Sequence, residues 1–254
     1  MKKKVICYIA LISILFTFLN ANVIPKEVSA KAEERNNTLQ CNEYTQEVNI
    51  DNEKIIYLTF DDGPSYKITN RILDILKKYN VKATFFVVGS QIKDREEILK
   101  RIYEDGHSIG LHTYTHKYKK IYSSQEYFLK EMTMTSKEIE KIIHIKPMAI
   151  RFPGGSKKHL NKELLDKLHK ENYKVYDWNA NIADGVTPNL SIDQFFRKAT
   201  NVKNKSQIIL LMHCNYDNEK TCEALPKIIE YYRNLGYQFC TINDNTPEYY
   251  FRFK

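Results

Sequence analysis

The sequence lacks the motifs that mark several common protein classes. It contains no glycine-rich G-x-G-x-x-G segment and no P-loop, so nothing in it supports nucleotide binding. It contains no Cys-x-x-Cys pair, which argues against a structural zinc knuckle. Despite a net charge of +8, it has no arginine-rich run and no aromatic RNA-binding motif, and we therefore expect no nucleic-acid partner. No repeat or second binding module is visible.

The first 30 residues differ from the rest of the chain. Three lysines at positions 2–4 precede an almost unbroken apolar run at positions 5–19, a pattern typical of an export signal and short for a membrane span. Small residues at positions 28 and 30 suit a signal peptidase. We predict a signal peptide at residues 1–30, with an uncleaved membrane anchor as the alternative. Either way, the remaining chain lies outside the cytoplasm, secreted or associated with the cell wall.

The rest of the chain divides into a polar stretch and one domain. Residues 31–52 lack periodicity, so we predict a tether there, and residues 53–254 are long enough for a single domain with a substantial core. We expect a monomer. The predicted signal carries four lysines and one glutamate, which leaves the remaining chain a net charge of about +5. A mildly basic exported protein suits an anionic surface such as a bacterial wall.

From residue 54 onwards, short apolar runs alternate with segments of helical periodicity about seven times. Such alternation predicts βαβ units and a parallel sheet. The length is slightly short for an eightfold barrel, so the predicted fold is an α/β, distorted and incomplete (β/α) barrel. An open doubly wound sheet is the alternative. The expected strands are residues 55–60, 83–88, 108–111, 148–152, 173–178, 208–212 and 237–242.

Residues capable of chemistry gather where these predicted strands end. In a parallel α/β fold the carboxyl ends of the strands lie at one edge, where active sites are found. We therefore expect these side chains to share one site. They are Asp61, Asp62, His112, His116, Arg151, Asp177, Trp178 and His213.

Two histidines and a carboxylate form a recurring catalytic metal set. His112 and His116 have the i, i+4 spacing that places two imidazoles on one side of a turn. Adjacent carboxylates at Asp61 and Asp62 would repel each other if buried and unpaired, which a cation relieves. Because successive residues of an extended chain point in opposite directions, we expect only one of them to bind the metal directly. Independent histidines and a solvated Asp-Gly turn are the simpler alternative, which the shared strand-end location disfavours.

Five segments, taken in order, resemble the motifs of the NodB-homology polysaccharide deacetylases, carbohydrate esterase family 4. The resemblance extends over roughly residues 53 to 245 and implies a distorted (β/α) barrel. The segments are Thr59-Phe60-Asp61-Asp62-Gly63-Pro64, His112-Thr113-Tyr114-Thr115-His116, Arg151-Phe152-Pro153-Gly154-Gly155, Asp177-Trp178 and Leu211-Met212-His213.

The resemblance also implies a cofactor and a substrate pocket. By it, Asp62, His112 and His116 bind a divalent metal, usually zinc, with cobalt, nickel or manganese as alternatives. Trp178 and Leu211 would line a small apolar pocket for the acetyl methyl group, which suits their chemistry. Without the motif order, Trp178 would be taken for a core residue.

Acid and base roles follow from the same resemblance. Asp61 matches the catalytic base and Arg151 the residue that pairs with it. His213 matches the general acid, and Asp177 the carboxylate that orients this histidine and tunes its pKa. Amide hydrolysis needs an activated water and a protonated leaving amine, and these groups can supply both.

Two positions depart from the family pattern. Gly154 stands where many relatives have tyrosine; its backbone N–H can still stabilise an oxyanion, but the ring is missing. Cys214 follows His213 where an acidic residue is common. It either pairs with Cys222 or remains a buried thiol, and the sequence favours neither.

The leading hypothesis is a metal-dependent hydrolase that removes N-acetyl groups from a cell-wall glycan, peptidoglycan N-acetylglucosamine first. Alternatives within the enzyme class are a deacetylase of chitin oligomers or another N-acetylglucosamine polymer, and an O-acetyl xylan esterase. A non-catalytic wall-binding protein is the alternative of another class. Membrane contact is expected only through the N-terminal segment, if it is not cleaved.

Overall fold

The computed structural model describes residues 54–202 and 205–253. The predicted signal peptide, the predicted tether and Cys41 lie outside these residues. Among the helices described, none is both long and apolar enough to cross a membrane.

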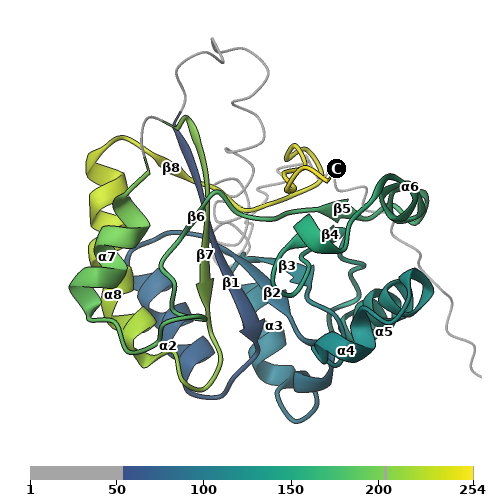
Figure 1. Ribbon diagram of the computed structural model, residues 1–254. Coiled ribbons are helices and arrows are strands. Elements are labelled where there is room, and N and C mark those ends of the chain that lie inside the picture. The colour runs from purple at the N-terminus through teal and green to yellow at the C-terminus, as the bar shows by residue number, and fades with distance from the viewer. Residues whose placement is uncertain (1–53, 203–204, 254) are drawn as a thin grey trace, which may run out of the picture. The chain divides into compact units, whose positions relative to one another are not determined.

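Strands and helices alternate along the described chain, as the apolar pattern predicts (Figure 1). The strands are β1 (Ile55–Gly63), β2 (Thr84–Val87), β3 (Ser108–Leu111), β4 (Ala149–Ile150), β5 (Lys174–Val175), β6 (Ala180–Asn181), β7 (Gln207–His213) and β8 (Gln238–Phe239). The α-helices are α2 (Ile68–Lys78), α3 (Glu96–Glu104), α4 (Tyr118–Ile121), α5 (Gln125–Ile143), α6 (Lys162–Lys170), α7 (Ile192–Thr200) and α8 (Glu219–Asn234), and two short 3-10 helices are η2 (Gly89–Gln91) and η3 (Ser156–Lys158).

All strand pairs of the sheet are parallel, and β1 lies in the middle. The order is β5-β4-β3-β2-β1-β7-β6, with β8 also pairing with β1. The sheet curls into an incomplete barrel, which confirms the predicted fold (Figure 1). The short strand β6 was not predicted, because two residues give too little periodicity to recognise. Its position matters for the site described below.

The two faces of the sheet bury different side chains, which explains why the sheet curls. Successive residues of a strand point to opposite faces. Ile56, Leu58 and Phe60 of β1 face outwards into the large core beneath the helices. Tyr57 instead joins a small inner cluster that contains no helix residue. A doubly wound sheet would carry helices on both faces, so this one-sided covering favours a barrel.

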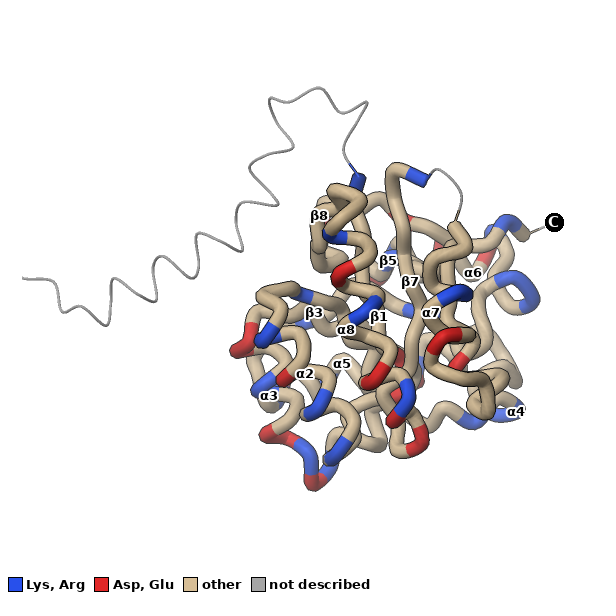
Figure 2. Tube along the Cα trace, turned by 90° about the vertical axis from the view of Figure 1, so that its left-hand side faces the viewer, with Lys and Arg blue, Asp and Glu red and all other residues tan. Residues whose placement is uncertain are grey.

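Charged residues are interspersed over the helices that cover the outer face. Figure 2 shows both basic and acidic positions on α2 and on α3. Arg101 of α3 pairs with Asp74 of α2 at 2.5 Å and with Asp105 at 3.3 Å. The net positive charge is therefore not concentrated on this face.

The end of the described chain pairs with the sheet beyond β5. The Asp177 N–H donates to the Tyr249 carbonyl at 2.6 Å, and Tyr176 and Tyr249 form a parallel bridge. Phe251 follows, and its ring packs at 5.3 Å from that of Trp178. This C-terminal segment thus extends the barrel wall at its β5 edge.

Candidate active site

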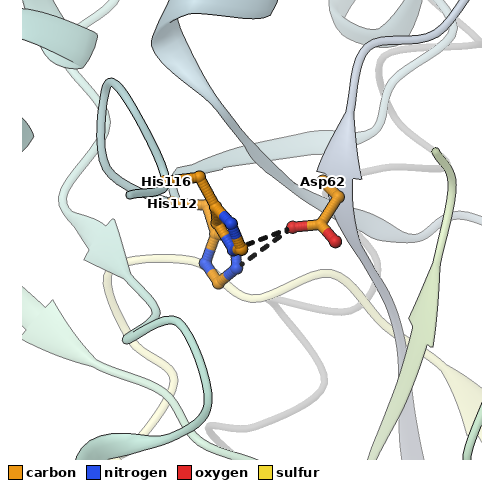
Figure 3. Close-up of side chains that lie close together, drawn as sticks. All are labelled: Asp62, His112 and His116. Atoms are coloured by element: carbon orange, nitrogen blue, oxygen red, sulfur yellow. Dashed lines mark ion pairs between the residues drawn. The ribbon is translucent and has the colours of Figure 1, made fainter. Parts of the chain in front are cut away.

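Asp62, His112 and His116 converge at the carboxyl edge of the sheet, as the sequence predicts. Their ligand atoms all lie within 4.8 Å of one another. The Nε2 atoms of His112 and His116 lie 3.4 Å and 3.2 Å from the same Asp62 oxygen, Oδ1 (Figure 3). Asp62 extends from the end of β1, and both histidines come from the loop after β3. One oxygen and two imidazole nitrogens therefore point to a common place.

The tautomer of His112 determines whether its Nε2 carries a proton or a lone pair. Its Nδ1 lies 2.9 Å from the Arg151 carbonyl, which can only accept, so Nδ1 carries the proton. Burial lowers the pKa of His112 to about 3, against the opposing charge of Asp62. The neutral ring therefore directs the Nε2 lone pair at a carboxylate oxygen that accepts no hydrogen bond from the described residues. Two electron-rich atoms facing each other require a cation, so these residues fit a divalent metal.

The backbone at Asp62 departs from the expected alternation. Its φ of 69° lies in the left-handed region, and the register of β1 with β2 shifts between Asp61 and Gly63. Both carboxylates consequently turn towards His112, whose Nε2 is 3.7 Å from Asp61 and 3.4 Å from Asp62. The expectation that they point in opposite directions is wrong here, because it assumed a regular strand.

A buried glutamate anchors the loop that carries the two histidines. One carboxylate oxygen of Glu131, in α5, accepts hydrogen bonds from the backbone N–H of Tyr114 at 2.9 Å and of Thr115 at 2.6 Å. The Thr115 hydroxyl lies 3.1 Å from both oxygens. Thr113 and His116 adopt left-handed φ values of 63° and 54°, which a loop of non-glycine residues rarely holds unaided. Glu131 supplies that restraint, and no sequence motif indicated it.

Asp61 pairs with a fully buried arginine inside the barrel. Nη1 of Arg151 lies 2.9 Å from Asp61 Oδ1 and 2.7 Å from the Thr59 hydroxyl. The Arg151 side chain also donates to the carbonyls of Tyr176 and Asp177. Burial raises the pKa of Asp61, and the charge and hydrogen bond of Arg151 oppose the rise. Together, burial and the Arg151 charge allow the Asp61 carboxylate to be ionised and still able to take up a proton.

His213 lies across from Asp61 in the register of β7 with β1. Its Nδ1 lies 2.8 Å from Asp184 Oδ1, and its backbone N–H donates to Asp184 Oδ2 at 2.8 Å. The Thr221 hydroxyl donates to the same Oδ2 at 2.7 Å. Burial lowers the pKa of His213, but the hydrogen bond to Asp184 and the charges of Asp184 and the Asp61-Asp62 pair raise it to about 9. The carboxylate of Asp184 thus favours the protonated form of His213.

The prediction that Asp177 orients His213 is wrong. The buried Asp177 carboxylate accepts hydrogen bonds from the Ser156 N–H at 3.0 Å, the Ser156 hydroxyl, and the Phe251 N–H at 2.7 Å. It thus ties the C-terminal segment to the loop after β4. The carboxylate on His213 is Asp184, seven residues further on, after the unpredicted strand β6.

The loop after β4 contains a backbone donor that no described residue uses. Gly154 has a φ of 75°, and its N–H donates to no acceptor in the described part of the chain. A Cβ on Gly154 would lie 3.0 Å from the Tyr118 hydroxyl. Tyr118 is half-exposed, and its ring packs edge-on against His116 at 5.5 Å. Tyr118 therefore supplies a ring next to Gly154, from a different part of the chain than the family pattern led us to expect.

The two predicted lining residues have different surroundings. Leu211 is buried in β7, in register with Thr59 of β1 and Asn181 of β6. Trp178 is half-buried between Phe251 and the Arg151 guanidinium, which lies 5.9 Å from its ring. Their contact with an acetyl methyl group remains a prediction.

Comparison with known proteins places this site in a family. The family model described as "Polysaccharide deacetylase" matches residues 49–176. The chain belongs to the polysaccharide deacetylase family. A peptidoglycan-N-acetylglucosamine deacetylase from Bacillus cereus is 34% identical over 190 residues, which are 73% of this chain and 68% of that protein.

Solved structures of other deacetylases share the fold. A polysaccharide deacetylase from Bacillus cereus superposes with a TM-score of 0.71 at 32% identity, covering 77% of this chain and 95% of the other. The catalytic domain of a peptidoglycan N-acetylglucosamine deacetylase from Eubacterium rectale has a TM-score of 0.73 at 31% identity, covering 81% and 95%. This chain is accordingly an enzyme of the polysaccharide deacetylase type.

The cysteine next to His213 of this deacetylase remains a thiol. Cys214 and Cys222 are both buried and free, so the Cys214–Cys222 disulfide considered above is absent. The Cys214 Sγ donates to the Asp61 carbonyl at 3.3 Å, and burial raises the pKa of the thiol. A protonated, buried thiol packs here as a small apolar side chain.

The anchoring of the histidine loop leads to a prediction for this deacetylase. Replacing Glu131 with alanine leaves the N–H groups of Tyr114 and Thr115 unpaired, so we expect metal affinity to fall by about 10–100-fold. The dissociation constant for zinc, measured by competition with a chromophoric chelator, tests this. Glu140→Ala, at an exposed position of the same helix, is the matched control. Equal affinities in the two variants would contradict the anchoring role.

Proposed function

We propose that this polysaccharide deacetylase removes N-acetyl groups from cell-wall glycan, with peptidoglycan N-acetylglucosamine as its first substrate, and that it depends on a divalent metal. The observation that carries the metal dependence is the convergence of two imidazole nitrogens, one of them on the neutral ring of His112, on a carboxylate oxygen that accepts no hydrogen bond from the described residues. Zinc suits three ligands of this type. The similarity to peptidoglycan N-acetylglucosamine deacetylases from Bacillus cereus and Eubacterium rectale supports the proposed substrate.

The roles of the side chains follow from their positions. Asp62, His112 and His116 would hold the metal, which would supply Lewis acidity by lowering the pKa of water and polarising the acetyl carbonyl. Asp61 removes the proton from the attacking water, and Arg151 holds this carboxylate in place.

Two further groups complete the reaction. Protonated His213 gives its proton to the departing sugar nitrogen, and Asp184 orients the imidazolium. The Gly154 N–H is available to the oxyanion. Base and acid stand on paired positions of β1 and β7, so both reach one amide bound between them.

The place of action rests on the N-terminal pattern. An export signal at residues 1–30 would deliver the enzyme to the wall, where its mildly basic charge suits an anionic polymer. We further propose that it acts as a monomer.

Acetate release from purified peptidoglycan tests the function. We expect zinc-loaded protein to release acetate, a chelator to reduce release to background, and added zinc to restore it. Mass analysis of the digested glycan then shows whether glucosamine or muramic acid residues have lost acetyl groups. A chelated protein that deacetylates at the original rate would refute the metal dependence. Zinc-loaded protein that leaves every acetylated glycan intact would refute the enzymatic proposal.

A further inference from the structure

Two exposed tyrosines and an arginine form a cluster beside the proposed metal ligands. The proposed reaction does not use this cluster. Tyr66 follows Asp62 in the loop after β1, and Tyr216 lies in the loop after β7. Arg95 lies between η2 and α3, beyond the end of β2. The neighbour of Tyr216, Asn215, has its amide nitrogen 3.5 Å from Asp62 Oδ2. This Tyr66–Arg95–Tyr216 platform therefore borders the site on its Asp62 side.

The platform is rigid although it is exposed. The Arg95 guanidinium lies 4.9 Å from the Tyr66 ring centre and 5.5 Å from that of Tyr216. The Tyr66 hydroxyl donates to the Asp94 carbonyl, and Arg95 donates to the Tyr216 hydroxyl and, at 2.9 Å, to the Gln91 carbonyl. The Tyr66 ring is thus held at its hydroxyl by Asp94 and against its ring by Arg95, and Tyr216 is held by Arg95. Yet Tyr66 is 54% exposed and Tyr216 is 52% exposed.

Rigid exposed aromatic rings are suited to binding. A ligand that packs on them does not have to order them, so little conformational entropy is lost. Sugar rings offer C–H faces for such packing and hydroxyl groups for hydrogen bonds at the rim. A glycan strand is also linear, so a strand with one unit over the metal must continue across the surface beside it. On the Asp62 side that surface is the platform.

We propose that the Tyr66–Arg95–Tyr216 platform binds a sugar unit of the same glycan strand, next to the unit that is deacetylated. The proposal rests on the proposed function, because its ligand is the N-acetylated glycan of that reaction. It adds a second binding position, and with it a preference for longer chains.

Steady-state kinetics on N-acetylglucosamine oligomers of increasing length test this. For zinc-loaded Tyr66→Ala/Tyr216→Ala protein, we expect KM for the longest oligomer to rise about tenfold, or about 1.4 kcal/mol, with kcat unchanged. KM for the shortest oligomer that is turned over should stay as in the unsubstituted protein. Tyr103→Ala, which removes a tyrosine of similar exposure from α3, is the matched control.

If Tyr66→Ala/Tyr216→Ala leaves KM unchanged at every oligomer length, or raises KM equally at every length, the platform does not bind an additional sugar unit. Tyr216→Leu alone, with zinc content and thermal unfolding measured alongside, provides a milder variant in case the double variant fails to fold. Isothermal titration calorimetry of the longest oligomer with zinc-loaded Asp61→Asn protein measures binding without turnover. The same titration of Asp61→Asn protein that also carries Tyr66→Ala and Tyr216→Ala measures the contribution of the platform. That binding experiment decides the platform even where no acetate is released, which separates its failure from that of the proposed function.

Discussion

Asp61→Asn should lower kcat for acetate release by about 10²–10⁴-fold while the protein keeps its zinc. The amide has the shape of the carboxylate and can still accept from Arg151, but it cannot take a proton from water. Asp62→Asn should behave differently, because Asp62 is a proposed ligand: zinc is lost first, and activity with it. Zinc content by elemental analysis and kcat under saturating zinc separate the two roles.

The Asp61 variant also tests the ion pair with Arg151. Removing one charge of a buried pair typically costs about 3–5 kcal/mol of stability, so the thermal midpoint of Asp61→Asn should fall. Folded protein must therefore be verified by circular dichroism before its kcat is interpreted. If folded Asp61→Asn retained full kcat, or lost zinc as readily as Asp62→Asn, Asp61 would not be the base.

Asp184→Asn should lower kcat by about 10²–10⁴-fold and move the alkaline limb of the pH profile to lower pH. The proposed reaction needs protonated His213, so activity falls as pH rises through the pKa of this histidine, which is raised to about 9. Asparagine removes the Asp184 charge and weakens the hydrogen bond, which lowers that pKa. The profile of kcat against pH locates the limb.

Asp177→Asn is the matched control, because it makes the same change in a buried aspartate that does not contact His213. It should loosen the connection of Ser156 to Phe251 and leave the alkaline limb in place. A shift of the limb in Asp177→Asn but not in Asp184→Asn would restore the role that the sequence suggested for Asp177.

The contrast between these two aspartates shows where sequence reasoning ends. Asp61, Asp62, His112 and His116 were predictable because each directly follows a clear apolar strand or forms a spaced pair. Asp184 follows β6, of only two residues, and the Asp177-Trp178 dipeptide before it imitates the expected motif. Ala180 and Ile182 are buried and lie at every second position before Asp184. This weak period-two pattern was the sequence signal that could have indicated a strand ending at Asp184.

No local sequence pattern could predict the contacts between segments that are distant in the chain. Glu131 lies inside an ordinary amphipathic helix, and only the fold brings it to the histidine loop. Tyr118 reaches Gly154 from α4 for the same reason. The left-handed φ of Asp62, which turns both carboxylates to one side, depends on tertiary packing rather than on residue type.

The central place of β1 in the sheet has a consequence for biosynthesis. β1 is made first among the described strands, yet one of its sides is covered by β7 and β8, which are made last. A ribosome-bound chain therefore holds Asp61 before its cross-strand neighbour His213 is made, and it exposes an unpaired edge of β1 until β7 has been synthesised. The acid and base of the proposed reaction therefore come together only after β7 has joined β1, so the site forms late in the folding of the chain.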